Sequence, residues 1–212
     1  MPENSKLIFN KELLAITIDR LCYQLIETYD DFNDCVIVGL QPRGVYLSKR
    51  IFDRLATIQT DLKLRNGDLD ISFFRDDFRR RDLIVPSATR MDFIVEGKKV
   101  VLVDDVLFTG RTIRAGLDAL LAFGRPASVE LLVLIDRKFS RQLPIEPNYI
   151  GKSIDTIASE KVKVHLKQPD GEDGVWLISE EKTYERTIKC SASIGKKRPQ
   201  PRGYRAYFQN GG

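Results

Sequence analysis

Two neighbouring carboxylates and a short hydroxyl-rich turn are the residues of this chain best suited to chemistry. Asp104 and Asp105 precede the turn Thr109–Thr112, which reads Thr-Gly-Arg-Thr. Hydroxyl groups, and a glycine that lets the backbone approach closely, suit a phosphate group. Ionised carboxylates only accept hydrogen bonds, so this pair suits vicinal sugar hydroxyls or a magnesium ion. These residue types therefore predict a site for a phosphorylated sugar.

The elements around the turn would place it where α/β proteins bind ligands. The run Val100–Val103 is apolar and rich in β-branched residues, as in buried parallel strands. Beyond the turn, apolar residues recur at helical spacing between Ile113 and Phe123. The turn thus joins a strand's carboxyl end to a helix's amino end, whose amides favour phosphate. An aspartate pair alone fits a solvated strand end equally well, and only the whole stretch favours a ligand site.

Strand and helix patterns alternate along the rest of the chain. The predicted elements are a helix over 10–27 capped by Asn10, a strand over 35–40, a helix over 45–55, and strands over 68–74, 128–135, 161–166 and 175–178. This order predicts an α/β fold with a mostly parallel sheet flanked by helices.

Composition indicates an ordinary globular protein. Hydrophobic residues make up 42% and charged residues 30% of the 212 positions, which suits one domain with a substantial core. No apolar run approaches the roughly 20 residues that span a bilayer, and the polar start lacks a signal-peptide pattern. The three cysteines are scattered without zinc-site spacing. We therefore expect a cytoplasmic protein with no membrane partner.

Basic charge is concentrated at the carboxyl terminus. The net charge is +4, and residues 186–212 hold seven basic residues and no acidic one, so residues 1–185 carry −3. The terminal stretch also lacks periodicity, and we expect a disordered tail over 186–212 after a domain over 1–185. A global electrostatic argument for nucleic-acid binding would rest on this tail.

The stretch 103–112 reads Val-Asp-Asp-Val-Leu-Phe-Thr-Gly-Arg-Thr and resembles the 5-phosphoribosyl-1-pyrophosphate (PRPP) motif of type I phosphoribosyltransferases. Its residues most resemble the motif of the bifunctional branch that regulates pyrimidine operons and acts as uracil phosphoribosyltransferase. The resemblance covers about residues 9–180 and implies that family's fold, with a mobile loop about 75–90 and a small hood about 137–180. It implies that PRPP or nucleotide is bound by Pro42, Arg43, Gly44, Asp104, Asp105, Val106, Leu107, Phe108, Thr109, Gly110, Arg111 and Thr112.

In the family, the acid pair holds the ribose hydroxyls, which implies a catalytic role for Asp104 and Asp105. The sequence Phe-Arg-Asp-Asp at 74–77 resembles the root of the family's mobile loop, which closes over the substrates and keeps water from the reacting centre. We expect a catalytic arginine in this loop, namely Arg79, with Arg80 or Arg81 as alternatives. The resemblance also implies Mg²⁺ bound largely by the phosphates of PRPP, without dedicated protein ligands other than the acid pair.

The turn at 41–44 resembles the family's pyrophosphate loop, which in this branch usually reads Lys-Thr-Arg-Gly. Here Arg43 and Gly44 are kept, whereas Gln41 and Pro42 replace the lysine and the threonine. Such a loop binds pyrophosphate through backbone amides, so its shape matters more than its side chains. The lost lysine nevertheless removes one cation from a site for a highly charged leaving group.

The base is expected to lie against the end of the strand over 128–135. The resemblance implies base contacts by Ile135, Arg137 and the backbone of Val162. Relatives that use hypoxanthine or guanine carry an aspartate just before the Thr-Gly of the turn, where Phe108 stands here. A phenylalanine cannot exchange a proton with a purine, so uracil is the better prediction.

These observations predict PRPP-dependent transfer to uracil that gives UMP and pyrophosphate. The resemblance also implies a homo-oligomer and UMP-dependent binding of pyrimidine leader mRNA, for which Arg141 and Lys152 are the candidate contacts. The branch's usual histidine is absent before Leu143-Pro144-Ile145, and one residue is inserted there. The alternative is an RNA-binding attenuator, or a PRPP or UMP sensor, with little or no turnover.

Overall fold

The structure, a computed structural model, describes residues 5–76, 86–157 and 159–179. The chain divides into a unit over 1–181 and a second unit over 182–212. The second unit lies outside the described residues, as does the predicted tail over 186–212. The same holds for residues 77–85, so the candidate arginines Arg79, Arg80 and Arg81 are not described.

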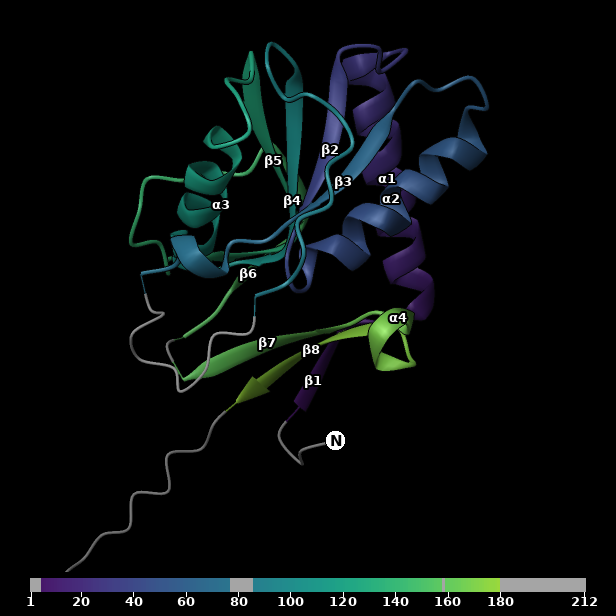
Figure 1. Cartoon of the computed structure of the whole chain (residues 1–212). Coiled ribbons are helices and arrows are strands. Elements are labelled where there is room, and N and C mark those ends of the chain that lie inside the picture. Colours follow the sequence, from purple (N-terminus) through teal and green to yellow (C-terminus); the bar gives the residue numbers. More distant parts are fainter. Residues whose placement is uncertain (1–4, 77–85, 158, 180–212) are drawn as a thin grey trace, which may run out of the picture. The chain divides into compact units, whose positions relative to one another are not determined.

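Strands and helices alternate through the first unit (Figure 1). In chain order they are β1 (Ser5–Phe9), α1 (Lys11–Tyr29), β2 (Cys35–Leu40), α2 (Gly44–Ile58), β3 (Arg65–Leu69), the 3-10 turn η1 (Ser72–Phe74), β4 (Lys99–Leu107), α3 (Arg111–Leu121), β5 (Ser128–Lys138), β6 (Tyr149–Asp155), β7 (Glu160–His165), α4 (Lys167–Asp170) and β8 (Gly174–Ser179). The predicted cap of the first helix is confirmed, because the Asn10 side chain accepts a hydrogen bond from the Leu13 amide at 2.8 Å.

A five-stranded sheet forms the centre, in the order β3-β2-β4-β5-β6, and all its pairings are parallel. In Figure 1, α3 lies on one side of this sheet, and α1 and α2 lie on the other. The predicted α/β class with a mostly parallel sheet is therefore confirmed. Strand β4 is the central strand, so the residues at its carboxyl end are flanked by the ends of β2 and β5.

The apolar run at 100–103 explains why β4 is central. All four side chains are completely buried, and successive ones point to opposite faces of the sheet. Val101 and Val103 pack in the core cluster that includes α1 and α2, whereas Val100 and Leu102 pack in the cluster that includes α3. A strand buried on both faces needs this continuous apolar sequence, which is why the pattern identified it.

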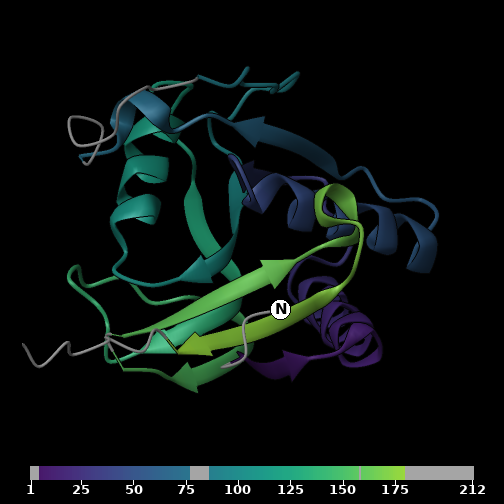
Figure 2. The ribbon, with the colours of Figure 1, turned by 90° about the horizontal axis from the view of Figure 1, so that it is seen from below.

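A smaller antiparallel sheet, in the order β1-β8-β7, forms the hood together with α4 (Figure 2). The predicted hairpin over 161–166 and 175–178 is confirmed as β7 and β8. Strand β1 was not expected, because only one side of this short strand meets the core. The hood contributes Val164, Leu166 and Val175 to the core cluster of α1 and α2.

Besides β1 and the short helix α4, which were not predicted, two parts of the main sheet differ from the predicted elements. The strand expected over 68–74 is wrong, because β3 ends at Leu69 and η1 follows. The Asp70 carboxylate accepts hydrogen bonds from the Ser72 amide at 3.0 Å and the Ser72 hydroxyl at 2.6 Å, and this local turn ends the strand. Strand β6 was missed, since its sequence Tyr-Ile-Gly-Lys-Ser-Ile-Asp mixes small and polar residues.

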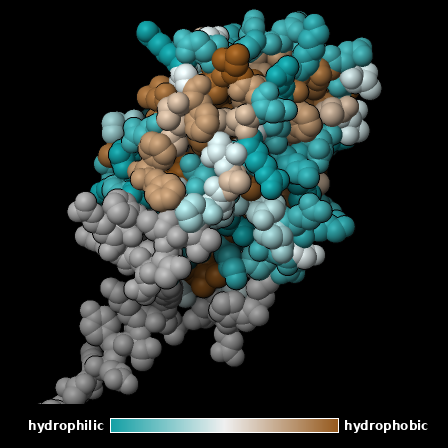
Figure 3. All heavy atoms as spheres, in the orientation of Figure 1, coloured by the Kyte–Doolittle hydropathy of each residue, from teal (hydrophilic) through white to brown (hydrophobic). Residues whose placement is uncertain are grey.

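The surface is mixed in character. Figure 3 shows apolar side chains gathered in the upper part of the face, bordered by hydrophilic ones. Large apolar side chains that are mostly exposed include Phe73, Ile94 and Leu121. Among the described residues, no helix is long and apolar enough to cross a bilayer.

Candidate active site

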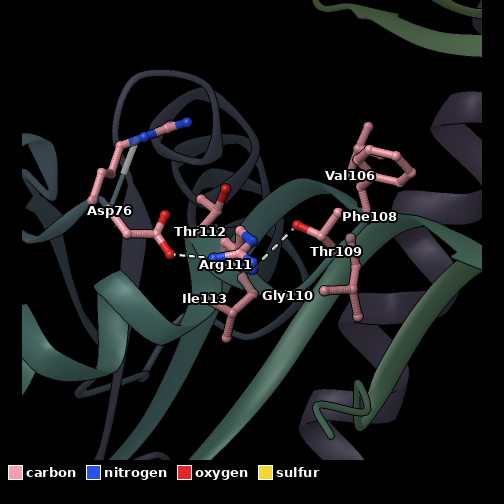
Figure 4. A pocket seen from close by; sticks show the side chains of 10 residues that line it. Asp76, Val106, Phe108, Thr109, Gly110, Arg111, Thr112 and Ile113 are labelled. Carbon is pink, nitrogen blue, oxygen red and sulfur yellow. Dashed lines mark hydrogen bonds and ion pairs between the residues drawn. The ribbon is translucent and has the colours of Figure 1, made fainter. Parts of the chain in front are cut away.

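The predicted phosphate turn encloses a cavity of 310 Å³ at the end of β4 (Figure 4). Gly110 caps α3 with φ of +88°, a left-handed conformation that glycine adopts without strain. Eight consecutive residues, 106–113, line the cavity together with Arg75 and Asp76. The structure therefore brings the predicted turn and the root of the predicted loop to one pocket.

Arg111 is already engaged by side chains around this cavity. Its guanidinium forms an ion pair with Asp76 and donates a hydrogen bond to Gln142 Oε1 at 2.7 Å. Figure 4 shows Asp76 and Arg111 pointing toward each other across the pocket, with Phe108 beyond Thr109. The ion pair joins the phosphate turn to the chain just before residue 77, so Asp76 is a site residue that the sequence placed only in the loop.

The acid pair lies in β4 directly before the cavity lining. Asp104 is 6% exposed, and its Oδ1 accepts a hydrogen bond from the Asp105 amide at 2.9 Å. Burial raises the pKa of Asp104 well above its usual value, and the neighbouring Asp105 charge adds to the effect. Burial also raises the pKa of Asp105, although Arg43 partly opposes this shift. Two buried carboxylates at a strand end favour a functional role, because this arrangement opposes stability.

We expect Asp104→Asn to stabilise the fold while it lowers activity. The pKa of Asp104 is higher in the folded protein than in the unfolded chain. The protonated side chain therefore favours the folded state below the unfolded pKa, and this contribution to stability is lost as pH rises through the folded pKa and the buried carboxylate ionises. Thermal unfolding of both proteins should show a higher melting temperature for Asp104→Asn at pH 8, and the difference should shrink toward pH 4. A melting temperature that falls at pH 8 would contradict this account.

The predicted pyrophosphate loop lies against the backbone of β4. A Cβ atom at Gly44 would come within 2.3 Å of the Val103 carbonyl oxygen, so only glycine fits there. This close approach brings Arg43 to the acid pair, and its Nε lies 3.1 Å from Asp105 Oδ2. The kept Arg-Gly end of the loop therefore has two separate physical functions, close packing by the glycine and contact with Asp105 by the arginine.

Arg43 also connects the acid pair to the hood. Its Nη2 lies 2.6 Å from Asp170 Oδ2 and donates to the Val164 carbonyl of β7. Asp170 in turn accepts a hydrogen bond from the Leu166 amide at 2.9 Å, and the pKa of Asp170 is lowered chiefly by its hydrogen bond to Arg43. This contact could not be predicted from the sequence, since 127 positions separate the two residues.

Of the residues predicted to contact the base, only Arg137 lies beside the cavity-lining residue Phe108. The Arg137 guanidinium lies over the Phe108 ring at 4.0 Å from its centroid. It also donates to Thr156 Oγ1 and to the Glu160 carbonyl, each at 2.9 Å, so it spans from β5 to the start of β7. Ile135 is completely buried in the core, whereas Val162 is partly buried beside the same cluster.

The two residues expected to contact RNA lie in different settings. Lys152 is exposed on β6, with its Nζ 5.6 Å from the centroid of the Phe9 ring. Arg141 instead directs its guanidinium inward, and its Nη1 donates to the Phe108 carbonyl at 2.6 Å. The RNA role of both residues stays a prediction.

The described residues contain no group of three or more His, Cys, Asp or Glu side chains that could hold a metal ion. Asp76 lines the cavity and pairs with Arg111, whereas Asp104 and Asp105 lie in β4 directly before the lining residues, where Arg43 pairs with Asp105. Two buried oxygen donors fit an outer contact to a magnesium ion whose other ligands come from a bound phosphate and water.

Comparisons with known proteins concern the family and the fold of this chain. A sequence profile of the phosphoribosyl transferase domain matches residues 5–169. The chain is 43% identical over 171 residues to the bifunctional protein PyrR of Microcystis aeruginosa, covering 81% of this chain and 96% of that protein. It is 41% identical over 182 residues to the bifunctional protein PyrR of Halalkalibacterium halodurans, covering 84% and 99%.

Solved structures with the same fold are more distant in sequence. A hypoxanthine phosphoribosyltransferase of Staphylococcus aureus is 20% identical, with a TM-score of 0.61, and the match covers 84% of this chain and 94% of that one. The Trypanosoma cruzi enzyme is 16% identical, with a TM-score of 0.64, covering 84% and 97%. These two likenesses show the fold alone. With the profile match and the identities to PyrR proteins, they establish that this chain belongs to the phosphoribosyl transferase domain family, in its PyrR group.

Proposed function

We propose that the protein transfers the phosphoribosyl group of PRPP to uracil, giving UMP and pyrophosphate. The observation that supports this proposal is the contact of Arg43 with Asp105, because it joins the predicted pyrophosphate loop to the acid pair that directly precedes the cavity-lining residues 106–113. The membership in the PyrR group supports it. The pyrophosphate, the ribose and the 5′-phosphate of PRPP would thus each have a matching set of groups in this chain.

In this reaction the bond between ribose C1 and pyrophosphate breaks, a bond to uracil N1 forms, and uracil loses its N1 proton. Positive charge develops on the ribose ring as the leaving group departs. The carboxylates of Asp104 and Asp105 would accept hydrogen bonds from the ribose hydroxyls and stabilise this charge. The turn amides and the hydroxyls of Thr109 and Thr112 would hold the 5′-phosphate. A bound Mg²⁺ would neutralise phosphate charge and ease departure of pyrophosphate.

Phe108 supports uracil over a purine. Its ring lines the cavity and is 42% exposed, so an apolar face stands where a proton-exchanging aspartate would serve a 6-oxopurine. The likeness to hypoxanthine enzymes does not oppose this choice, because at 16–20% identity it concerns the fold.

The test is to incubate the full chain with PRPP, Mg²⁺ and one base at a time. UMP should form with uracil, while orotate, hypoxanthine and guanine should give no comparable product. Omission of Mg²⁺ with added chelator should stop turnover. Formation of a purine nucleotide in place of UMP would overturn the base assignment, and measurable UMP binding without turnover would favour a UMP sensor.

The word bifunctional in the names of the relatives favours a second activity. We propose UMP-dependent binding of pyrimidine leader RNA, with Lys152 as an exposed basic contact. Affinity for a leader hairpin should survive deletion of residues 186–212 and should increase with UMP. Binding that disappears with the deleted residues and ignores RNA sequence would be electrostatic only.

Self-association and location complete the proposal. Exposed apolar side chains such as Phe73 and Ile94 support a homo-oligomer. Light scattering of the full chain should then give a mass that is a multiple of 24.2 kDa. A cytoplasmic location is also proposed, and it rests on the sequence alone.

A further inference from the structure

We infer that Arg141 is a positioning residue for the phosphate turn. The inference rests on the proposed function, since it concerns the same pocket. Arg141 begins a segment, residues 141–145 between β5 and β6, which we call the supporting loop. Among the described residues, none of this loop lines the cavity itself. Its contacts are with the outer side of the turn that does.

The Arg141 guanidinium faces five acceptor groups, and most belong to the backbone. Nη1 donates to the carbonyls of Leu107, Phe108 and Arg137, at 3.2, 2.6 and 3.2 Å, and Nε donates to the Ile145 carbonyl at 3.0 Å. Nη2 forms an ion pair with Asp136, a side chain that is only 9% exposed. Arginine alone has a planar fork with enough donors for this arrangement.

The rest of the supporting loop holds the next peptide group of the turn. The amides of Gln142 and Leu143 both donate to the Thr109 carbonyl, at 3.0 and 3.3 Å. Leu143 and Ile145 pack below Gly110, where a Cβ atom would lie 3.4 and 3.3 Å from them. Three successive carbonyls of the turn are therefore fixed on the side of the supporting loop.

This arrangement determines the direction of the amides that would bind phosphate. In a trans peptide group, the carbonyl of one residue and the N–H of the next point in opposite directions. The supporting loop holds the carbonyls of residues 107–109. The N–H groups of residues 108–110 therefore point away from the supporting loop. Phosphate binding at such a turn depends on several amides aimed at one point, so Arg141 acts on the ligand through the backbone.

This role differs from a contact with RNA. An arginine that binds RNA needs its donors directed to solvent, whereas the Arg141 side chain is 23% exposed and its donors face acceptors within the protein. Arg141 therefore belongs to the catalytic pocket as a support, and exposed residues such as Lys152 are better placed for RNA.

The test compares Arg141→Met with Arg141→Lys and with Arg20→Met. Arg20 is a matched control, because its guanidinium also donates to two backbone carbonyls, of Ile150 and Gly151, at 2.9 and 2.6 Å. Calorimetry with ribose 5-phosphate is the main measurement, since this ligand carries the phosphate whatever base is used. Binding of UMP and of uridine, which lacks phosphate, is measured in parallel.

Arg141→Met should weaken ribose 5-phosphate binding by roughly 10- to 100-fold, because small displacements of several amides act together. The ratio of UMP to uridine affinity should fall with it, which a general loss of structure would not cause. Arg141→Lys should lose roughly 3- to 10-fold, since an ammonium has three donors and no fork. Arg20→Met should leave the affinity unchanged. If Arg141→Met does not fold, the ribose 5-phosphate affinity of Arg141→Lys tests the inference.

A loss below about twofold in a folded Arg141 variant would overturn the inference. Loss of leader-RNA binding with unchanged ribose 5-phosphate affinity would do the same in favour of an RNA contact. Wild-type protein that binds ribose 5-phosphate but makes no UMP would refute the proposed transfer to uracil, while the Arg141 effect would still support the inference. Wild-type protein without affinity for ribose 5-phosphate would refute both.

Discussion

Replacement of Asp105 by asparagine should lower kcat/KM for PRPP by roughly 100- to 1000-fold, the usual effect of removing one preorganised group that stabilises developing charge. Asp105 is the acid-pair member that Arg43 contacts, and its side chain is 14% exposed. Asparagine keeps one oxygen acceptor but removes the negative charge beside the ribose ring. The loss should appear mainly in kcat, because charge on the ring develops in the transition state.

The fold should survive this change. Burial raises the pKa of Asp105, so loss of the charge relieves an unfavourable interaction and the melting temperature should stay equal or rise at pH 7.5. Asp53→Asn on α2 is a suitable control, because it removes a carboxylate from a helix that does not line the phosphate cavity. Kinetics of Asp105→Asn that match the wild type would refute the ribose role of the acid pair.

Arg43→Met should raise KM for PRPP by roughly 10- to 100-fold, since it removes a partly buried, charge-assisted contact at the acid pair. Arg43 lowers the pKa of Asp105, so without it that pKa should be still higher. The ionised form of Asp105 is the active one, and activity is lost as pH falls through its pKa. The acid side of the pH–kcat profile should therefore move to higher pH in the variant.

Two other variants separate this effect from a simple loss of hood attachment. Arg50 lies on α2, which Arg43 caps, and it pairs with Asp173 of the hood at 2.6 Å, without contact to the acid pair. Arg50→Met and Asp170→Asn should therefore leave the pH profile in place and change KM for PRPP only slightly. If Arg50→Met reproduces the full Arg43→Met effect, the contact with Asp105 is not what matters.

Several features of the site follow from sequence because they are local. The succession of β4, the turn and α3 is determined by residues that are neighbours in the sequence, and the same is true of the Asn10 cap of α1. A continuous apolar strand that is buried on both faces is typical of a parallel sheet, and this pattern placed the acid pair at a strand end. Resemblance then added the pyrophosphate loop, which Gly44 supports by its close approach to Val103.

Contacts between distant positions could not be predicted in this way. Arg43 and Asp105 are 62 positions apart. Hydrophobic periodicity and capping patterns describe neighbouring residues, so they do not indicate which distant side chains pair. Strand β6 was missed because its residues are only half-buried at a sheet edge, where hydrophobic alternation is weak.

By itself, the sequence determined the α/β class, the central strand, the phosphate turn and the acid pair, because burial and helix capping act over a few residues. Only the tertiary structure decided how side chains distribute their hydrogen bonds. Arg141 shows the reason most clearly. In sequence it is one more basic residue in a loop, and an exposed cation and an internal support look alike there. The fold brings the Leu107 and Phe108 carbonyls to its guanidinium, and that arrangement gives the residue its place in the site.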